Sequence, residues 1–216
     1  MDNRIVILDS GLSNLGSVHN ALKQLGVEAK VSACWSEVKE AEGLIFPGVG
    51  SFGYAVEELS RRGWFSLLQE FIHTGRPFLG ICLGMQLLYS ESEENPFAEE
   101  KLAPGLEVVP GRVIKFEPGL PVPHVGWNQV YPQKNHPLFA GIPPGAYFYF
   151  THSYYGTPFH QDHILATTHY GNSFASAVNN CGALGVQFHP DKSGPEGLRL
   201  LSNCVNMVFN PNSITE

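Results

Sequence analysis

Residues 77–86 read Pro77-Phe78-Leu79-Gly80-Ile81-Cys82-Leu83-Gly84-Met85-Gln86, an apolar run that leads into one cysteine between two glycines. The apolar run predicts a short buried strand, and a helical pattern begins at Met85. A cysteine on a tight turn between them is exposed as a nucleophile, because the flanking glycines leave space around it. The helix N-terminus favours the thiolate, and the Leu83 N–H is placed to face an oxyanion. Cys82 is therefore a candidate nucleophile, the alternative being an inert buried thiol.

Strands and helices alternate in the first half of the chain. The apolar run at residues 5–8 is followed by an amphipathic helix over residues 15–25, which closes at Gly26. Further strands are expected at residues 27–31, 43–46 and 77–81, and further helices at residues 35–41 and 55–74. This alternation predicts an α/β fold with a parallel, doubly wound sheet.

After about residue 95 the pattern changes to short strands separated by proline and glycine. These strands are expected at residues 106–109, 112–116, 126–131, 147–150, 164–168 and 174–178. Their spacing predicts antiparallel strands laid onto the parallel core. A last strand over residues 185–188 and a helix over residues 195–209 complete the expected single domain, which spans residues 1–216.

The composition narrows the possible partners and cofactors. The 216 residues include 13 basic and 20 acidic side chains, a formal charge of −7 without any basic run, so neither nucleic acid nor an anionic membrane is expected as a partner. No apolar run has the length of a secretory signal or a membrane span, and the four cysteines form no C-x-x-C pair. Several histidines lack the helical spacing of metal ligands: His152, His160, His163 and His169. We expect a cytoplasmic protein without metal or cofactor.

A histidine and an acidic residue follow the last predicted strand. His189 comes directly after an apolar run and is the natural base for a cysteine nucleophile. Residues two apart on an extended segment point to the same side, so Asp191 can orient the imidazole. Because ligands bind at the carboxyl ends of strands in open α/β sheets, we expect these residues to meet Cys82 in one cleft. The alternatives are a histidine at a strand end and an ordinary surface acid.

A glycine-rich turn follows another predicted strand. Pro47-Gly48-Val49-Gly50 is too short for a phosphate-binding loop and lacks a following lysine. The glycines around Val49 leave its peptides free to reorient, so an N–H at Val49 or Gly50 can join that of Leu83 in an oxyanion hole. The alternative is a plain tight turn.

Together these residues resemble the triad (class I) glutamine amidotransferases, and the resemblance covers essentially the whole chain. The motifs that carry it are Asp9-x-Gly11-x-x-Asn14-Leu15, Pro47-Gly48-Val49-Gly50-Ser51-Phe52, Gly80-Ile81-Cys82-Leu83-Gly84-Met85-Gln86, Pro123-His124-Val125-Gly126-Trp127-Asn128, His152-Ser153-Tyr154-Tyr155 and Phe188-His189-Pro190-x-Lys192-Ser193. The cysteine turn is shared by many amidotransferases. The PGVGSF, HVGWN and HSYY blocks together point to the branch that serves histidine biosynthesis.

The resemblance implies a flavodoxin-like glutaminase that hydrolyses L-glutamine to glutamate and ammonia. It also implies a heterodimer, in which the ammonia passes to a (β/α)8-barrel synthase subunit. By resemblance, glutamine is bound by Gln86, Glu94, Ser153 and Tyr154. A carboxylate such as that of Glu94 can pair with the substrate ammonium, the alternative being a solvated acid. The residues that the resemblance places at the partner interface are Asn14, His124, Trp127, Asn128 and Lys192, although Trp127 could equally belong to the core.

The chain departs from the family pattern in three places. Asp191 stands where the family has glutamate, and Ser10 and Ser13 replace a tyrosine and a glycine in the opening loop. These departures keep two other functions open: a paralogue that feeds ammonia to a surface-sugar amidotransferase, and a catalytically silent regulatory subunit. Cys82 and His189 weigh against the silent subunit. A cysteine peptidase explains neither Gln86 and Glu94 nor the HVGWN block.

Overall fold

The computed structural model describes residues 5–12, 15–98 and 101–209. Its main sheet contains β1 (Ile5–Leu8), β2 (Ala29–Ser32), β3 (Gly43–Gly48), β4 (Phe78–Cys82), β8 (His124–Pro132), β9 (Ala146–His152), β11 (Ile164–Tyr170), β12 (Asn172–Asn180) and β13 (Ala183–Val186). A smaller sheet contains β5 (Tyr89–Ser92), β6 (Ala103–Pro104), β7 (Val109–Lys115) and β10 (Tyr154–Pro158). The helices are α1 (Leu15–Gln24), α2 (Trp35–Glu40), α3 (Phe52–Arg61), α4 (Trp64–His73), α5 (Leu83–Gln86) and α6 (Gly194–Phe209), with 3₁₀ turns η1 (Pro137–Phe139), η2 (Gln161–His163) and η3 (Pro190–Lys192).

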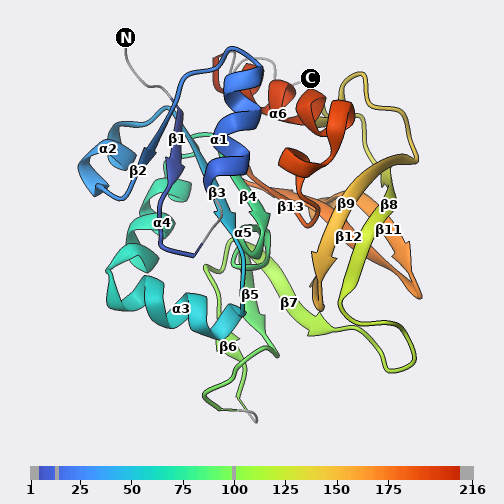
Figure 1. The fold of residues 1–216 in the computed structure, drawn as a ribbon. Coiled ribbons are helices and arrows are strands. Elements are labelled where there is room, and N and C mark those ends of the chain that lie inside the picture. Colours follow the sequence, from blue (N-terminus) through green and yellow to red (C-terminus); the bar gives the residue numbers. More distant parts are fainter. Residues whose placement is uncertain (1–4, 13–14, 99–100, 210–216) are drawn as a thin grey trace.

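The main sheet is parallel in one half and antiparallel in the other (Figure 1). Its strand order is β2-β1-β3-β4-β13-β12-β11-β8-β9. The strands from β2 to β13 pair in parallel, and those from β13 to β9 pair antiparallel. The expected α/β fold with a parallel core is confirmed. The antiparallel strands, however, mostly extend the same sheet instead of lying on it.

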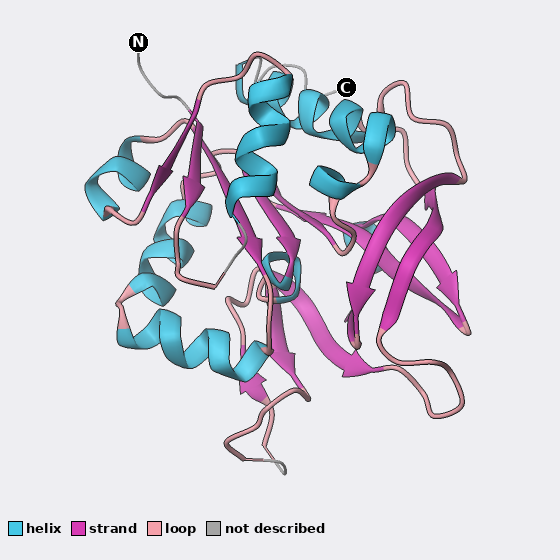
Figure 2. Ribbon diagram, viewed as in Figure 1, coloured by secondary structure: helices cyan, strands magenta, loops and turns pink. Residues whose placement is uncertain are grey.

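Helices cover both faces of the parallel strands, as a doubly wound sheet requires. Alternate residues of β1 enter different cores: Ile5 and Ile7 pack with α1 and α6, whereas Val6 and Leu8 pack with α3 and α4. Figure 2 shows the helices gathered around β1 to β4, while strands dominate the other half of the molecule. Among the described residues, no helix is both long and apolar enough to cross a membrane.

Two predicted helices differ from those of the structure. The helix expected over residues 55–74 is divided into α3 and α4 at Gly63, which has a φ of 75° and begins the second helix in a new direction. The helix expected from Met85 ends after one turn, and Tyr89 already belongs to β5. The residues from Leu83 to Tyr89 are all buried, so this segment has no polar face for a longer surface helix.

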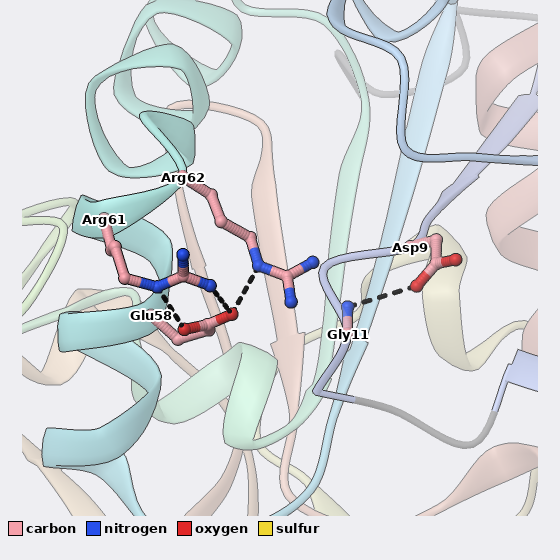
Figure 3. Close-up of polar contacts among 5 residues, drawn as sticks. All are labelled: Asp9, Gly11, Glu58, Arg61 and Arg62. Atoms are coloured by element: carbon pink, nitrogen blue, oxygen red, sulfur yellow. Dashed lines mark hydrogen bonds and ion pairs between the residues drawn. The ribbon is translucent and has the colours of Figure 1, made fainter.

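The opening loop packs against the end of α3 (Figure 3). The Gly11 N–H donates to Asp9 Oδ1 at 3.1 Å, and Gly11 has a φ of 78°. The Arg62 guanidinium, which is paired with Glu58, lies so close to Gly11 that a Cβ there would be 2.9 Å from it. The positive φ therefore favours glycine at this position, whereas the Arg62 side chain could move aside. Ser10 is fully buried in this loop, whereas Ser13 and Asn14, the latter an expected partner contact, lie outside the described residues.

Candidate active site

Cys82 lies on a strained turn at the carboxyl end of β4. Its φ of 55° and ψ of −108° form a backbone conformation that a non-glycine residue rarely adopts. The flanking glycines allow the chain to close on itself. A Cβ at Gly80 would overlap the Gly84 carbonyl, and one at Gly84 would overlap the Phe46 carbonyl in β3. The turn holds the sulfur at one place beyond the sheet, which is the geometry expected of a presented nucleophile.

The sulfur of Cys82 is buried but receives polar contacts. Cys82 is 7% exposed, and burial raises the pKa of its thiol to about 12. A backbone hydrogen bond from Leu83 and the side-chain amide of Gln187, with Nε2 3.7 Å from Sγ, oppose that rise in pKa. The Sγ atom also lies 3.9 Å from the Thr151 carbonyl oxygen. The thiol is therefore protonated at neutral pH in the chain alone.

A cavity of about 380 Å³ opens beside Cys82, a volume typical of small-ligand sites. It is lined by Val49, Gly50, Cys82, Leu83, Gln86, Glu94, Pro123, Thr151, His152, Ser153 and Tyr154. Every residue that we expected to bind glutamine or to form the oxyanion hole is among them. The cavity thus combines a thiol, a carboxylate and several backbone groups.

Glu94 and Gln86 occupy this cavity in different ways. The Glu94 carboxylate accepts a hydrogen bond from the Phe52 N–H at 2.8 Å, and burial raises the pKa of this carboxyl. Gln86 is 5% exposed, and its Nε2 donates to the Tyr154 carbonyl at 2.8 Å and to Gln187 Oε1 at 3.0 Å. The Gln86 amide nitrogen is therefore already engaged by the protein, whereas Glu94 retains acceptor capacity for a cation.

His189 and Asp191 follow β13, the strand beside β4. The register pairs Val186 with Ile81, so both strands end at the same edge of the sheet. The backbone N–H of His189 donates to the Tyr149 carbonyl at 2.8 Å, which holds this segment against β9. His189 and Asp191 line a cavity of about 20 Å³, separate from the large one and sharing Val49 with it.

The contact between His189 and Asp191 is longer than a hydrogen bond. Their Nδ1 and Oδ1 atoms are 3.8 Å apart, and both side chains are almost completely buried. Burial lowers the pKa of His189 to about 4 and raises that of Asp191. The Asp191 carboxylate therefore lies near the imidazole of His189 but is too far from it to form a hydrogen bond.

The turn expected to complete an oxyanion hole has one N–H turned away. The Val49 N–H donates to the Leu12 carbonyl at 2.8 Å. Gly50 has a φ of 108°, and the space beside its Cα is open. The 48–49 peptide, which carries the Val49 N–H, is thus held by Leu12, whereas the 49–50 peptide, which carries the Gly50 N–H, has both the backbone freedom and the space to reorient.

The expectation that His124 faces a partner is wrong for its side chain. His124 is 4% exposed, and its ring stacks on Phe150 and Tyr170. Asn128 is also turned inward, with Nδ2 3.2 Å from His124 Nε2 and 3.0 Å from the His169 carbonyl. Because β8 alternates between two faces, both residues lie on the face opposite to that of Trp127.

The other face of β8 carries an exposed apolar surface. Trp127 is 54% exposed and packs edge-on against Tyr149 of β9, at 6.3 Å between ring centroids. Lys192 Nζ lies 5.9 Å from the Tyr149 ring. Val125 and Tyr147 extend the surface and are 56% and 54% exposed. The β8–β9 surface is defined here as Val125 and Trp127 of β8 with Tyr147 and Tyr149 of β9, and Lys192 of η3 lies beside it. β9 also contributes Thr151 and His152 to the cavity.

The sequence interpretation missed Gln187 and His152 as neighbours of the nucleophile. Gln187 is fully buried, and His152 donates from Nδ1 to the Tyr154 carbonyl at 2.8 Å. The signal for Gln187 was its place two residues before His189, since alternate residues of an extended segment share a side. The signal for His152 was weaker, because its place in the cavity beside Cys82 depends on how β9 pairs with β8.

Comparison with known proteins agrees with this arrangement. Residues 6–208 match the family described as glutamine amidotransferase class-I. The chain is 47% identical over 205 residues to the imidazole glycerol phosphate synthase subunit HisH of Symbiobacterium thermophilum, covering 95% of this chain and 94% of that relative. It is 45% identical over 208 residues to HisH of Methanosarcina barkeri, covering 94% and 98% of the two chains.

Solved structures show the same fold at low sequence identity. A crystal structure of a glutamine amidotransferase superposes with a TM-score of 0.73 at 19% identity, covering 95% of this chain and 99% of the other. PurLQS from Thermotoga maritima gives a TM-score of 0.73 at 15% identity, covering 96% and 100%. The fold, the strained cysteine and the family match define a class-I glutamine amidotransferase. Within this class, the chain belongs to the HisH family of imidazole glycerol phosphate synthase subunits, as its identity to full-span relatives shows.

Proposed function

We propose that this subunit hydrolyses L-glutamine to L-glutamate and ammonia, with Cys82 as the nucleophile. The observation that carries the proposal is the strained Cys82 turn at the wall of a cavity that also contains Glu94. His189 takes the proton of the Cys82 thiol, the thiolate attacks the γ-amide carbon, and the C–N bond then breaks as this proton passes from His189 to the departing ammonia. Water attacks the resulting thioester with His189 as base and releases glutamate.

The proposed binding mode places the charged end of glutamine at Glu94. Its carboxylate is half-buried and can pair with the substrate ammonium, while backbone groups of Ser153 and Tyr154 line the same cavity. The Leu83 N–H and a reoriented peptide at Val49 and Gly50 would stabilise the tetrahedral anion. In this proposal Gln86 supports the cavity wall through its hydrogen bond to the Tyr154 carbonyl.

We further propose that the ammonia passes to a (β/α)8-barrel synthase subunit that docks on the β8–β9 surface. Ammonia released into water is protonated and is no longer a nucleophile, so the reaction requires an enclosed transfer. The exposed side chains of Trp127, Val125 and Tyr147 form an apolar surface next to the cavity, and Lys192 adds a cation at its edge. This composition suits a docked protein partner.

Glutamine turnover is expected to rise about a hundredfold when the barrel subunit and its acceptor substrate are added, the effect of correcting a misplacement of about 1 Å. In the chain alone, burial keeps the pKa of Cys82 near 12 and that of His189 near 4, so proton transfer between them is unfavourable. The Val49 N–H is also committed to the Leu12 carbonyl. The measurement is glutamate release by the subunit alone and in the complex. Equal rates would contradict partner activation.

The variant Asp191→Glu is expected to retain glutaminase activity within about tenfold of the wild type, because the extra methylene can shorten the 3.8 Å gap to His189. Asp191→Asn is the matched control. It keeps the size of the side chain but removes the charge that stabilises the imidazolium, so we expect kcat to fall by more than about a hundredfold. Steady-state kinetics of the complex test both variants, and a larger loss in Asp191→Glu than in Asp191→Asn would refute the assignment.

A further inference from the structure

A buried amide contacts the nucleophile from the strand end beside it. Gln187 is fully buried, and its Nε2 lies 3.7 Å from Cys82 Sγ, within the range of an N–H···S hydrogen bond. Its backbone N–H donates to the Ser176 carbonyl at 2.9 Å, which fixes the residue next to β12. A buried amide costs free energy unless its polar atoms are paired, so its contacts are informative.

The hydrogen-bond network determines which end of the Gln187 amide faces the sulfur. The Tyr154 carbonyl can only accept, so the Gln86 atom 2.8 Å from it must be the amide nitrogen. This nitrogen donates to a second atom at 3.0 Å, which must therefore be the oxygen of Gln187. The remaining polar atom of Gln187 is its nitrogen. The N–H group consequently points at Cys82.

The donors and acceptors around the Tyr154 carbonyl, where this network begins, are also determined. The Tyr154 carbonyl accepts a second hydrogen bond, from His152 Nδ1 at 2.8 Å. Nε2 of His152 then accepts from His124 Nδ1, at 3.0 Å. Two donors thus converge on one carbonyl, and neither glutamine amide can flip without leaving a buried polar atom unpaired.

We propose that Gln187 is a catalytic residue that donates its amide N–H to the Cys82 sulfur and stabilises the thiolate, with Gln86 as the positioning residue that holds the amide in this orientation. The inference rests on the proposed glutaminase function. It adds a side-chain donor on the nucleophile itself, distinct from the donors of the oxyanion hole. Its effect is on the sulfur before attack, whereas an oxyanion hole acts on the substrate oxygen.

The buried surroundings of the Cys82 sulfur disfavour its thiolate form, and a hydrogen-bond donor to the sulfur stabilises that form. Burial is the largest influence on the Cys82 thiol and favours its neutral form, whereas the hydrogen bond from Gln187 lowers the pKa. The charged and titratable groups that face this region are those of His189, Asp191 and Lys192 beyond β13, and His152 on β9. Lys192 lowers the pKa of Cys82 and Asp191 raises it. Among the groups that lower the pKa of Cys82, the backbone N–H of Leu83 has the largest effect, followed by Lys192 and then by the amide of Gln187, which is the side-chain hydrogen-bond donor to the sulfur.

The test measures the reactivity of Cys82 with iodoacetamide in the full chain, because only the thiolate reacts. The rate at Cys82 is followed between pH 7 and 10.5 by mass spectrometry of its peptide, which separates it from the exposed Cys34 and Cys181. Gln187→Met keeps the size and removes the donor. We expect the rate at each pH to fall about five- to tenfold, the effect of one lost hydrogen bond. Gln187→Glu places an acceptor or a negative charge at the sulfur and should lower the rate further.

Ser176→Ala is the matched control, since this buried hydroxyl of β12 makes no hydrogen bond among the described residues. It should leave the pH profile unchanged. Thermal unfolding of each variant identifies any loss of fold, and Gln187→Glu remains informative if Gln187→Met does not fold.

In the complex, the Gln187 variants should have a lower kcat, with KM within about twofold of the wild type, since the donor acts on the nucleophile and not on binding. Wild-type reactivity in both Gln187 variants would overturn the proposal. Slower alkylation in a chain that fails to hydrolyse glutamine would instead refute the proposed function alone.

Discussion

Replacement of Cys82 by alanine is expected to abolish glutamine hydrolysis, with a loss of at least about 10⁴-fold in kcat in the complex with the barrel subunit. Alanine leaves the cavity and the backbone N–H groups in place but removes the only atom there that we propose to form the thioester. Residual hydrolysis then depends on water alone. The measurement is glutamate release, together with the mass of the intact chain after a rapid acid quench, which detects the glutamyl thioester in the wild type.

Cys204→Ala is the matched control for this prediction. Cys204 is also a free buried cysteine, and burial raises its pKa to about 12 as it does for Cys82. It lies within α6, away from the strained turn and from the large cavity. Its loss should leave kcat unchanged. Comparable activity losses in the two variants would show that the cysteines matter for packing and would contradict the nucleophile assignment.

The parallel half of the fold could be predicted from the sequence because its signals are local. The continuous apolar runs of β1, β3 and β4 identify strands buried on both faces, and Gly26 marks the end of α1. The smaller sheet could not be predicted in the same way. β5 follows α5 after only two residues, and it pairs with β7, the register joining Tyr89 to Val109. That pairing is a tertiary preference without a local sequence signal.

The candidate site was predictable where a strand end fixes it. The topology rule for α/β sheets predicted that Cys82 and His189 follow neighbouring strands, which the pairing of β4 with β13 shows. It did not predict that the cavity beside Cys82 is lined without His189, which lines the smaller cavity instead. The distance between His189 and Asp191 could not be predicted, because it depends on the turn η3 and on the aspartate side chain, which is one methylene shorter than glutamate. The inward orientation of His124 and Asn128 was available from alternation along β8, since Trp127 lies between them on the opposite face.

Gly84→Ala is expected to destabilise the protein by about 3 kcal/mol, which corresponds to a fall in Tm of about 6–12 °C. A methyl group at this position would overlap the Phe46 carbonyl, and it would separate α5 from β3 at the turn that carries Cys82. The backbone of β3 is hydrogen-bonded between β1 and β4, so it cannot move aside to accommodate the methyl group. Thermal unfolding monitored by circular dichroism measures the effect.

Gly141→Ala separates the steric effect at Gly84 from the general effect of replacing a glycine. Gly141 has a φ of 72° with open space around it, so alanine there incurs only the cost of the left-handed conformation, about 1 kcal/mol. The fall in Tm should therefore be several times larger for Gly84→Ala. Glutamine hydrolysis should also fall in that variant at temperatures where it remains folded, because the same displacement moves the Leu83 N–H and the sulfur together. An unfolding temperature for Gly84→Ala no lower than that for Gly141→Ala would show that the contact with β3 is not what fixes the Cys82 turn.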